Sequence, residues 1–240
     1  MKILVVNPNT TVSMTEKIGA AARSVAAPGT EIVAVTSPMG PASIEGFYDE
    51  AFAVPGLIRA LGEAGRADAA IIACFDDTGL DAARSFAPFP VIGICQAALV
   101  TASQIAKRIT VVTTLSRSVT PLEELVERYG FGRHVKVTAC EAPVLALEDP
   151  GSDAREKLEA EIARALHDGA EAIVLGCAGM ADLAAALSQK FGAPVVDGVA
   201  AAVKQAEGLV SLGLRTSKRG AYAAPLAKPY AGDLADFTPR

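Results

Sequence analysis

The stretch ADAAIIACFDDTGLDAAR at residues 67–84 decides the fold that we predict, together with GAEAIVLGCAGMADLAAAL at residues 169–187. Each stretch contains a short apolar run, a cysteine where the run ends, a small turn and the start of an Ala-rich segment. Such apolar runs are typical of strands buried on both faces of a parallel sheet. The likeness continues in PVIGICQAALVTA at 90–102 and PVVDGVAAAVKQA at 194–206. All β-α-β units look alike, but the repeated pattern indicates two similar lobes of about 100 residues each.

Short apolar, β-branched runs alternate with helical segments along the chain. We expect strands at Lys2–Val6, Thr30–Thr36, Ala69–Ala73, Val91–Ile94, Ile109–Thr113, His134–Ala139, Ala172–Leu175 and Val195–Val196. We expect helices at Thr11–Ala26, Ala51–Ala64, Asp81–Phe86, Ala97–Ala106, Pro121–Tyr129, Ser152–Asp168, Ala181–Phe191 and Val199–Leu212. Strands that alternate with helices predict β-α-β units and parallel sheets. The predicted fold class is therefore α/β.

The composition excludes several classes of protein. Hydrophobic residues make up 51% of the 240 residues, so a sizeable core can form without disulfides or metals. The formal net charge of −5 provides no basic surface for nucleic acid or for anionic membranes. The apolar run at the N-terminus is too short for a signal peptide, and no window reaches the roughly 18 apolar residues of a membrane span. We therefore expect a cytoplasmic protein that binds neither nucleic acid nor a membrane.

Four cysteines are present, at Cys74, Cys95, Cys140 and Cys177, and in a reducing compartment we expect them to be thiols. None belongs to a CxxC pair and there are only 2 histidines, so the sequence does not support a metal site. Buried cysteines commonly serve as small hydrophobic side chains. We assign this role to Cys95 and Cys140, because neither has a partner in an equivalent environment, and we leave open whether either touches the site.

Cys74 and Cys177 differ from the other two because they hold equivalent positions in the two matching lobes, each directly after a predicted strand. Ligands of open α/β sheets bind at the carboxyl ends of the strands, which is where we expect both thiols. Each cysteine is followed by a turn and a helix, whose free N–H groups should lower the pKa of the thiol and favour the thiolate. The same N–H groups can hold a developing oxyanion.

Paired thiols could form a disulfide, bind a metal or transfer protons. Racemisation requires a proton to leave one face of a carbon and another to arrive at the opposite face, which two thiols across a cleft can achieve. With each sulfur roughly 3–3.5 Å from its reaction partner, the sulfurs would lie about 7 Å apart and stay reduced. The carbanion would need N–H or hydroxyl donors at the neighbouring carbonyl.

Polar turns could supply these donors, although each could equally be an ordinary turn or helix cap. The candidates are NPNTT at 7–11, PASIEG at 41–46 and the pair at 113–114. Asp76 and Asp77 could be catalytic carboxylates, or one of them could cap the helix that follows.

Small and aromatic residues near the cysteines have two readings as well. Gly176 and Gly179 flank Cys177 and allow the backbone to approach a ligand closely. Phe47 or Phe75 could line an apolar pocket or pack in the core. Neither a GxGxxG fingerprint nor a P-loop motif is present, so a nucleotide site has no local support.

Stretches along nearly the whole chain resemble the Asp/Glu/hydantoin racemase superfamily, and within it the hydantoin and allantoin racemases. The matching stretches are NPNTT (7–11), PASIEG (41–46), IIACFDDTGLDAAR (71–84), PVIGICQAA (90–98), VVTTLSRSV (111–119), PVLALED (143–149), AIVLGCAGMADL (172–183) and PVVDGVAAAVK (194–204). The cysteine segments, SIEG and TTLSRSV are the specific ones. The resemblance implies two pseudo-symmetric α/β lobes with the active site in the cleft between them.

The resemblance also implies an activity. It implies a racemase without cofactor or metal, in which Cys74 and Cys177 transfer protons at C5 of a five-membered cyclic ureide, and it implies a homo-oligomer. The substrate-contacting positions that it transfers to this chain are Asn9, Ser43, Ile44, Phe75, Asp76, Thr114, Ala178 and Gly179. We divide the chain into an N-terminal lobe of residues 1–97 with 200–240 and a C-terminal lobe of residues 98–199.

The residues after each cysteine depart from the amino-acid racemases of the superfamily. Those enzymes have Asn-Thr after the first cysteine and Thr-His after the second, whereas this chain has Phe75-Asp76 and Ala178-Gly179. The departure favours a neutral ring over aspartate or glutamate. The alternatives are an aspartate/glutamate-type racemase, a decarboxylase or isomerase of the same fold, and a non-catalytic module that binds a ureide. The sequence does not decide which ring or enantiomer is preferred, or how many subunits assemble.

Overall fold

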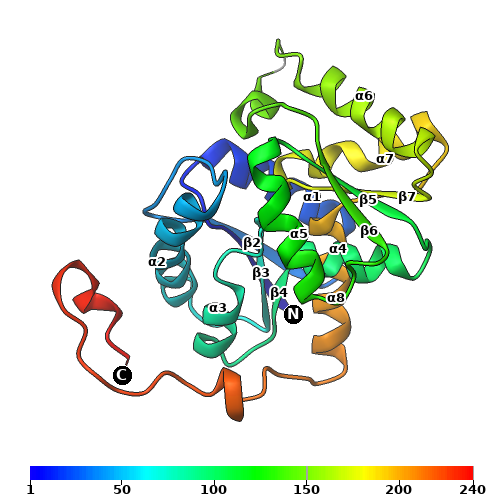
Figure 1. Ribbon diagram of the computed structural model, residues 1–240. Coiled ribbons are helices and arrows are strands. Elements are labelled where there is room, and N and C mark those ends of the chain that lie inside the picture. The colour runs from blue at the N-terminus through cyan, green and yellow to red at the C-terminus, as the bar shows by residue number, and fades with distance from the viewer. Residues whose placement is uncertain (150, 240) are drawn as a thin grey trace.

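The computed structural model describes residues 1–149 and 151–239. Within them the chain forms two four-stranded parallel sheets, in the strand orders β2-β1-β3-β4 and β6-β5-β7-β8 (Figure 1). The first sheet comprises β1 (Lys2–Asn7), β2 (Glu31–Thr36), β3 (Ala69–Ile72) and β4 (Val91–Gly93). The second comprises β5 (Ile109–Thr113), β6 (Val135–Ala139), β7 (Ala172–Leu175) and β8 (Val195–Val196). The predicted α/β fold with two parallel-sheet lobes is confirmed.

The strands β3 and β7, which precede the two candidate cysteines, occupy equivalent places in the two sheets. Each is wholly buried, and each pairs with the first strand of its sheet. At its end, Ala73 N donates to Val6 O at 2.8 Å, and Gly176 N donates to Val112 O at 2.8 Å. The chain therefore leaves both sheets at matching points of their carboxyl edges, one residue before each cysteine.

Helices follow the strands in the expected order. They are α1 (Val12–Val25), α2 (Phe47–Glu63), α3 (Leu80–Phe86), α4 (Ile94–Ser103), α5 (Val119–Arg128), α6 (Ala154–His167), α7 (Ala184–Phe191) and α8 (Gly198–Ser211). Short 3-10 segments are η1 (Ser116–Ser118), η2 (Val144–Glu148), η3 (Ala178–Leu183), η4 (Gly220–Tyr222) and η5 (Gly232–Phe237). The element order therefore alternates as predicted, with most boundaries within a few residues.

Three helix starts differ from the prediction by three residues or more, and α4 also ends at Ser103 rather than Ala106. The helix α2 begins at Phe47 rather than Ala51, and acidic residues in its first turn favour the earlier start. The helix α4 begins at Ile94 rather than Ala97 because its first amides are capped by a carboxylate from a distant turn. The predicted helix from Ala181 is the 3-10 segment η3 as far as Leu183, and α7 starts only after it.

One hydrophobic cluster fills the space between the two sheets. It contains apolar side chains from all eight strands and from helices on the inner faces, among them Ile3, Ile71, Ile92, Leu99, Ile109, Val137, Val174, Val196 and Val203. Two further clusters lie on the other faces, under α2 and α3 in one lobe and under α6 and α7 in the other. Figure 1 shows α6 and α7 at the top of the molecule and α2 and α3 at the left.

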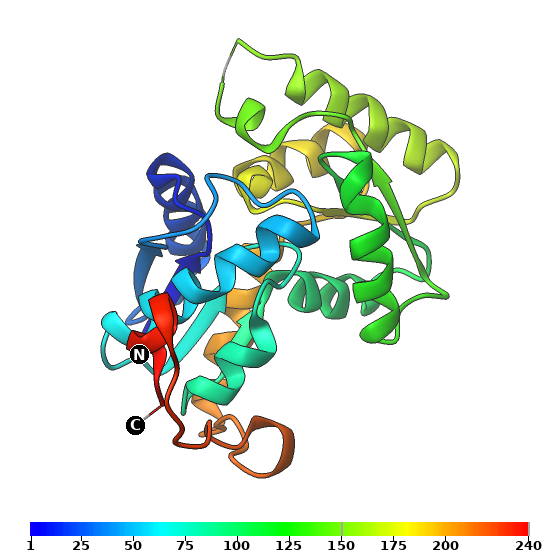
Figure 2. The same ribbon diagram turned by 60° about the vertical axis from the view of Figure 1, so that its left-hand side comes forward.

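The C-terminal residues form an arm over the first lobe. Lys218 Nζ donates to the carbonyls of Arg84 and Ser85 at the end of α3, and Arg59 of α2 lies over the ring of Phe237. Figure 2 shows the arm, in orange and red, leaving α8 and returning to α2. The division of the chain at residues 97 and 199 stays a prediction. No helix among the described residues is long and apolar enough to cross a membrane.

Candidate active site

A small cavity lies where the carboxyl edges of the two sheets face each other. Its lining residues come from both lobes: Asn9, Met14, Ile44, Ala73, Cys74, Phe75, Asp76, Thr113, Thr114, Ser118, Val144, Gly176, Cys177 and Ala178. Its volume is ≈ 30 Å³, which leaves room for about two water molecules. Eight of the ten positions expected to form the site line this cavity. The other two, Ser43 and Gly179, are sequence neighbours of lining residues but do not line it themselves.

Cys74 and Cys177 occupy equivalent turns in the two lobes. Asp77 N donates to Cys74 O at 3.0 Å, and Met180 N donates to Cys177 O at 3.1 Å, so each cysteine begins a tight turn. Both are free thiols and both are half-buried. They lie close enough that a charge on Cys177 raises the pKa of Cys74. The two sulfurs are therefore close neighbours that reach one cavity from opposite lobes.

Burial raises the pKa of both thiols, which corrects the expectation that the turns would favour thiolates. For Cys177 burial raises the pKa to about 12, opposed by the amide of Gly179. For Cys74 burial raises the pKa well above its ordinary value, and the charge of Asp76 raises it further. Backbone amides do act on the sulfurs as predicted, but removal of the thiolate from water outweighs them. In the closed cavity both groups are thiols at neutral pH.

Asp76 is a carboxyl group next to both thiols. Its charge raises the pKa of Cys74 and of Cys177. Burial raises its own pKa to about 7, and the nearby carboxylates of Glu50 and Asp77 add to this. Near neutral pH the Asp76 carboxyl is therefore divided between an ionised form that opposes thiolates and a neutral form that can donate a hydrogen bond.

Asp77 caps a helix, as expected, but the helix is not the one that follows it in the chain. Its carboxylate accepts hydrogen bonds from the amides of Cys95 and Gln96 at 2.9 and 3.0 Å, so it caps α4 rather than the helix that follows it. It also accepts a hydrogen bond of 2.7 Å from the hydroxyl of Tyr129, at the end of α5. The N-cap position of α4 is Gly93, which has no side chain to perform this task. Asp77 thus ties the Cys74 turn to both lobes.

Polar groups from the first turn of the chain are organised around Asn9. Its side-chain oxygen accepts from Asn7 Nδ2 at 2.8 Å and from the amide of Thr11 at 3.0 Å. Its Nδ2 contacts only the sulfur of Met14, at 3.2 Å, among the groups described. Sulfur is a weak acceptor, so the amide N–H groups of Asn9 remain available to an oxygen in the cavity.

The remaining expected positions have different surroundings. Thr114 is buried at the cavity wall, and Ile44 reaches the cavity from the loop at 41–46. That loop contacts the second lobe, because Glu45 Oε1 accepts from the amide of Val144 at 3.0 Å. Phe75 both lines the cavity and packs in the central cluster, whereas Phe47 is 59% exposed and does not line the cavity.

Several lining residues were not anticipated from the sequence. Met14 and Val144 are apolar residues whose place depends on how the lobes meet, so no local signal marks them. Ser118 lies within the specific stretch TTLSRSV, which could have drawn attention to it. The other two cysteines are core residues as expected: Cys95 is 0% exposed in α4, and Cys140 is buried with its sulfur donating to Thr114 O.

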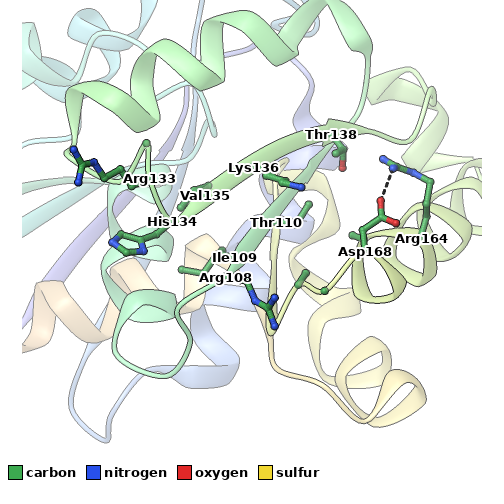
Figure 3. A pocket seen from close by; sticks show the side chains of 14 residues that line it. Arg108, Ile109, Thr110, Arg133, His134, Val135, Lys136, Thr138, Arg164 and Asp168 are labelled. Atoms are coloured by element: carbon green, nitrogen blue, oxygen red, sulfur yellow. Dashed lines mark hydrogen bonds and ion pairs between the residues drawn. The ribbon is translucent and has the colours of Figure 1, made fainter.

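A larger hollow of ≈ 390 Å³ lies at the opposite edge of the second sheet (Figure 3). Its floor is formed by the first residues of β5 and β6, including Thr110 and Lys136. Ligands of such sheets bind at the carboxyl ends of strands, not here. Two arginines that line the hollow already form ion pairs, Arg164 with Asp168 and Arg108 with Glu171. The hollow is therefore not the candidate active site.

Within residues 1–149 and 151–239, no group of three or more His, Cys, Asp or Glu side chains is placed to hold a metal ion.

The fold and the cavity define a class of two-lobed α/β proteins that bring one thiol from each lobe into a shared site. Residues 3–206 match the family described as Asp/Glu/Hydantoin racemase. The chain belongs to this family and is an isomerase of the racemase type. The resemblance seen in the sequence is thereby confirmed.

Relatives cover nearly the full length of the chain. A hydantoin racemase of Rhizobium meliloti is 52% identical, over 97% of this chain and 98% of that protein. A hydantoin racemase of Pseudomonas sp. (strain NS671) is 47% identical, over 99% of this chain and 97% of that protein. The solved structure of allantoin racemase from Klebsiella pneumoniae has a TM-score of 0.96 at 50% identity, and 100% of each chain is covered.

Proposed function

We propose that this protein interconverts the D and L forms of 5-substituted cyclic ureides, hydantoins or allantoin, by proton transfer between C5 and the thiols of Cys74 and Cys177. The observation that supports the proposal most strongly is that equivalent turns of the two lobes bring both thiols to one cavity. A planar carbanion held between two such groups can lose a proton on one face and gain one on the other.

The proton transfers balance without a further reactant. One thiolate forms an S–H bond as the C5–H bond breaks, and the electron pair moves into the neighbouring carbonyl as an enolate. The opposite thiol then gives its proton to C5 and becomes the thiolate. We assign the enolate oxygen to the side-chain amide of Asn9, because within the described residues its Nδ2 donates only to the weak acceptor Met14 Sδ.

The raised pKa values suit this chemistry. A thiolate whose pKa is raised by burial is a stronger base than a free one, and a proton on carbon requires a strong base. The cost is that little thiolate is present at neutral pH. The reaction therefore depends on groups that stabilise the thiolate once substrate fills the cavity.

The lining of the cavity favours a neutral ring as the substrate. None of the residues that line it is Lys or Arg, so no fixed positive charge is placed to hold an α-carboxylate. The relatives described above are racemases of hydantoin and of allantoin, whose five-membered rings carry carbonyl and N–H groups but no α-carboxylate. Because the cavity of ≈ 30 Å³ is too small for a ring, the lining residues must move apart when substrate binds.

The test is isotope exchange at C5. Single enantiomers of a 5-substituted hydantoin and of allantoin are incubated with the enzyme in D₂O, and loss of the C5 proton is followed by NMR beside optical rotation. We expect both signals to change with the native chain. The absence of exchange with every ureide offered would contradict the proposal.

Cysteine variants separate the two bases. We expect Cys74→Ser and Cys177→Ser each to reduce the rate of racemisation at least about a hundredfold. A serine hydroxyl is a far weaker acid than a thiol, and general acid–base catalysis contributes roughly 10²–10⁴-fold to a rate. Cys140→Ser is the matched control, since a serine there can still donate to Thr114 O, and it should leave the rate within a factor of about three. Normal racemisation by both of the first two variants would rule out the two-base mechanism.

A further inference from the structure

Thr78 is a buried hydroxyl without an evident structural task. It is 2% exposed, and its Oγ1 has no well-formed hydrogen bond within the described part of the chain. A buried hydroxyl left without a partner is costly, which makes such a group a candidate for a role that the resting state does not display. Thr78 lies four residues after Cys74, at the end of the same turn.

The turn places this hydroxyl at the sulfur of Cys74. Asp77 N donates to Cys74 O at 3.0 Å and Leu80 N donates to Asp77 O at 3.0 Å, so the chain folds back over the cysteine. In the thiol form the hydroxyl makes no complete hydrogen bond, yet it lies close enough to lower the pKa of Cys74. A thiolate is a better acceptor than a thiol and would complete the bond.

The second lobe has no hydroxyl at the position equivalent to Thr78. Aligning the two turns on their cysteines places Ala181 where the first lobe has Thr78. The amide two residues after each cysteine lowers its pKa, Asp76 for Cys74 and Gly179 for Cys177, but Cys177 has the positive charge of Lys17 where Cys74 has the hydroxyl of Thr78. The two thiols, which are equivalent in the fold, thus have different partners for the charged state.

We propose that Thr78 is a positioning residue that donates its hydroxyl hydrogen to the sulfur of Cys74 whenever that sulfur is a thiolate. It favours the charged form of Cys74, as the charge of Lys17 does for Cys177 in the second lobe. The role rests on the two-base function proposed above, because only a cysteine that must carry charge in each cycle needs such a donor. Its test uses the thiols themselves and requires no substrate.

The experiment is the pH dependence of alkylation by iodoacetamide, read for each thiol by mass spectrometry. Trypsin places Cys74 in the peptide 67–84 and Cys177 in the peptide 165–190, so the two are measured separately. In Thr78→Val we expect Cys74 to react about tenfold more slowly at any pH below its midpoint, the size expected for one hydrogen bond to a charged group. The profile of Cys177 should not move.

Controls make the result specific. Thr78→Ser retains the hydroxyl and should restore the native profile of Cys74. Thr138→Val removes the other buried hydroxyl without a partner, on β6 and away from the cavity lining, and should change neither thiol. The proposal is overturned if Thr78→Val leaves the Cys74 profile unchanged or shifts both thiols equally. Failure of isotope exchange in the native chain would instead reject the racemase function and leave this result intact.

Discussion

Asp76 lies beside both reactive thiols, and its charge raises the pKa of each. Since burial raises its own pKa to about 7, its charge is itself lost as the pH falls through neutrality. The residue therefore couples the three groups: a proton on Asp76 makes either thiol easier to ionise. This coupling is a property of side chains from two turns, one in each lobe, that the fold brings to one cavity.

The coupling predicts the pH dependence of the reaction. A base must be deprotonated to act, so raised thiol pKa values place the rising limb of kcat/KM above neutrality, and the rate should increase from pH 7 to pH 9. Asp76→Asn removes a negative charge, lowers both thiol pKa values and should move the limb to lower pH. The profile is measured by polarimetry. Asp81→Asn, which neutralises an exposed carboxylate on α3, is the control. If the rising limb of kcat/KM lay at the same pH in the native enzyme and in Asp76→Asn, the coupling would be contradicted.

The sequence predicts much of the site at this scale, because strand ends are visible in it and residues that follow strand ends meet at one edge of a sheet. Cys74 and Cys177 are predicted on that basis, and the resemblance singles out Asn9 and Thr114 within polar stretches at strand ends; all four line one cavity. The direction of the thiol pKa shifts could not be predicted, since it depends on how completely the opposite lobe removes water. The catalytic roles of Cys74 and Cys177 stay a prediction.

At the scale of elements, the two lobes solve the same capping problem in different ways. The helix α8 is capped by Asp197 at its own N-cap, which accepts from the amides of Val199 and Ala200. The equivalent helix α4 has Gly93 there and depends on Asp77 from the cysteine turn. The sequence shows the first arrangement, because a cap and its helix are adjacent, but not the second, which is why the start of α4 was predicted too late.

The packing of α2 depends on a glycine. A Cβ on Gly56 would lie 2.1 Å from both Met39 O and Ser37 Oγ, in the segment that leads to the loop at 41–46. We expect Gly56→Ala to lower the free energy of unfolding by about 1–3 kcal/mol through overpacking, and to reduce activity by displacing Ile44.

A glycine in α8 provides the matched control for this substitution. Gly208 has nothing within 4 Å of the position a Cβ would take, and Gly208→Ala should stabilise the protein by about 0.5–1 kcal/mol. Urea denaturation followed by circular dichroism measures both variants. Equal effects of the two substitutions would show that α2 does not need the close approach.

At the scale of the whole molecule, the lobes are held across the cavity by several contacts besides the central cluster. Lys17 of α1 pairs with Asp182 of η3 at 3.3 Å, and Tyr129 of the second lobe donates to Asp77 of the first. The sequence predicts two lobes from its repeated pattern, but contacts between lobes join residues far apart in the chain and leave no local pattern. The homo-oligomer implied by the resemblance stays a prediction.

The C-terminal arm contributes little to this assembly. None of residues 223–239 is buried, and Leu226 is 80% exposed. We expect a chain that ends at Tyr222 to lose less than about 1 kcal/mol of unfolding free energy, because surface groups rarely contribute more. A chain that ends at Leu212 should lose more, since it also lacks the bonds from Lys218 to the end of α3. Urea titration distinguishes the two, and a large loss in the longer chain would show that the arm supports the fold.

The cluster between the sheets also governs how the protein can be made. It takes side chains from Ile3 at one end and Ala206 at the other, so a ribosome that has finished only residues 1–97 holds a sheet with one apolar face still open to water. The turn at Cys74 has been synthesised by then, but Cys177, its partner across the cavity, has not. The two thiols are consequently brought together late, once α8 has left the exit tunnel.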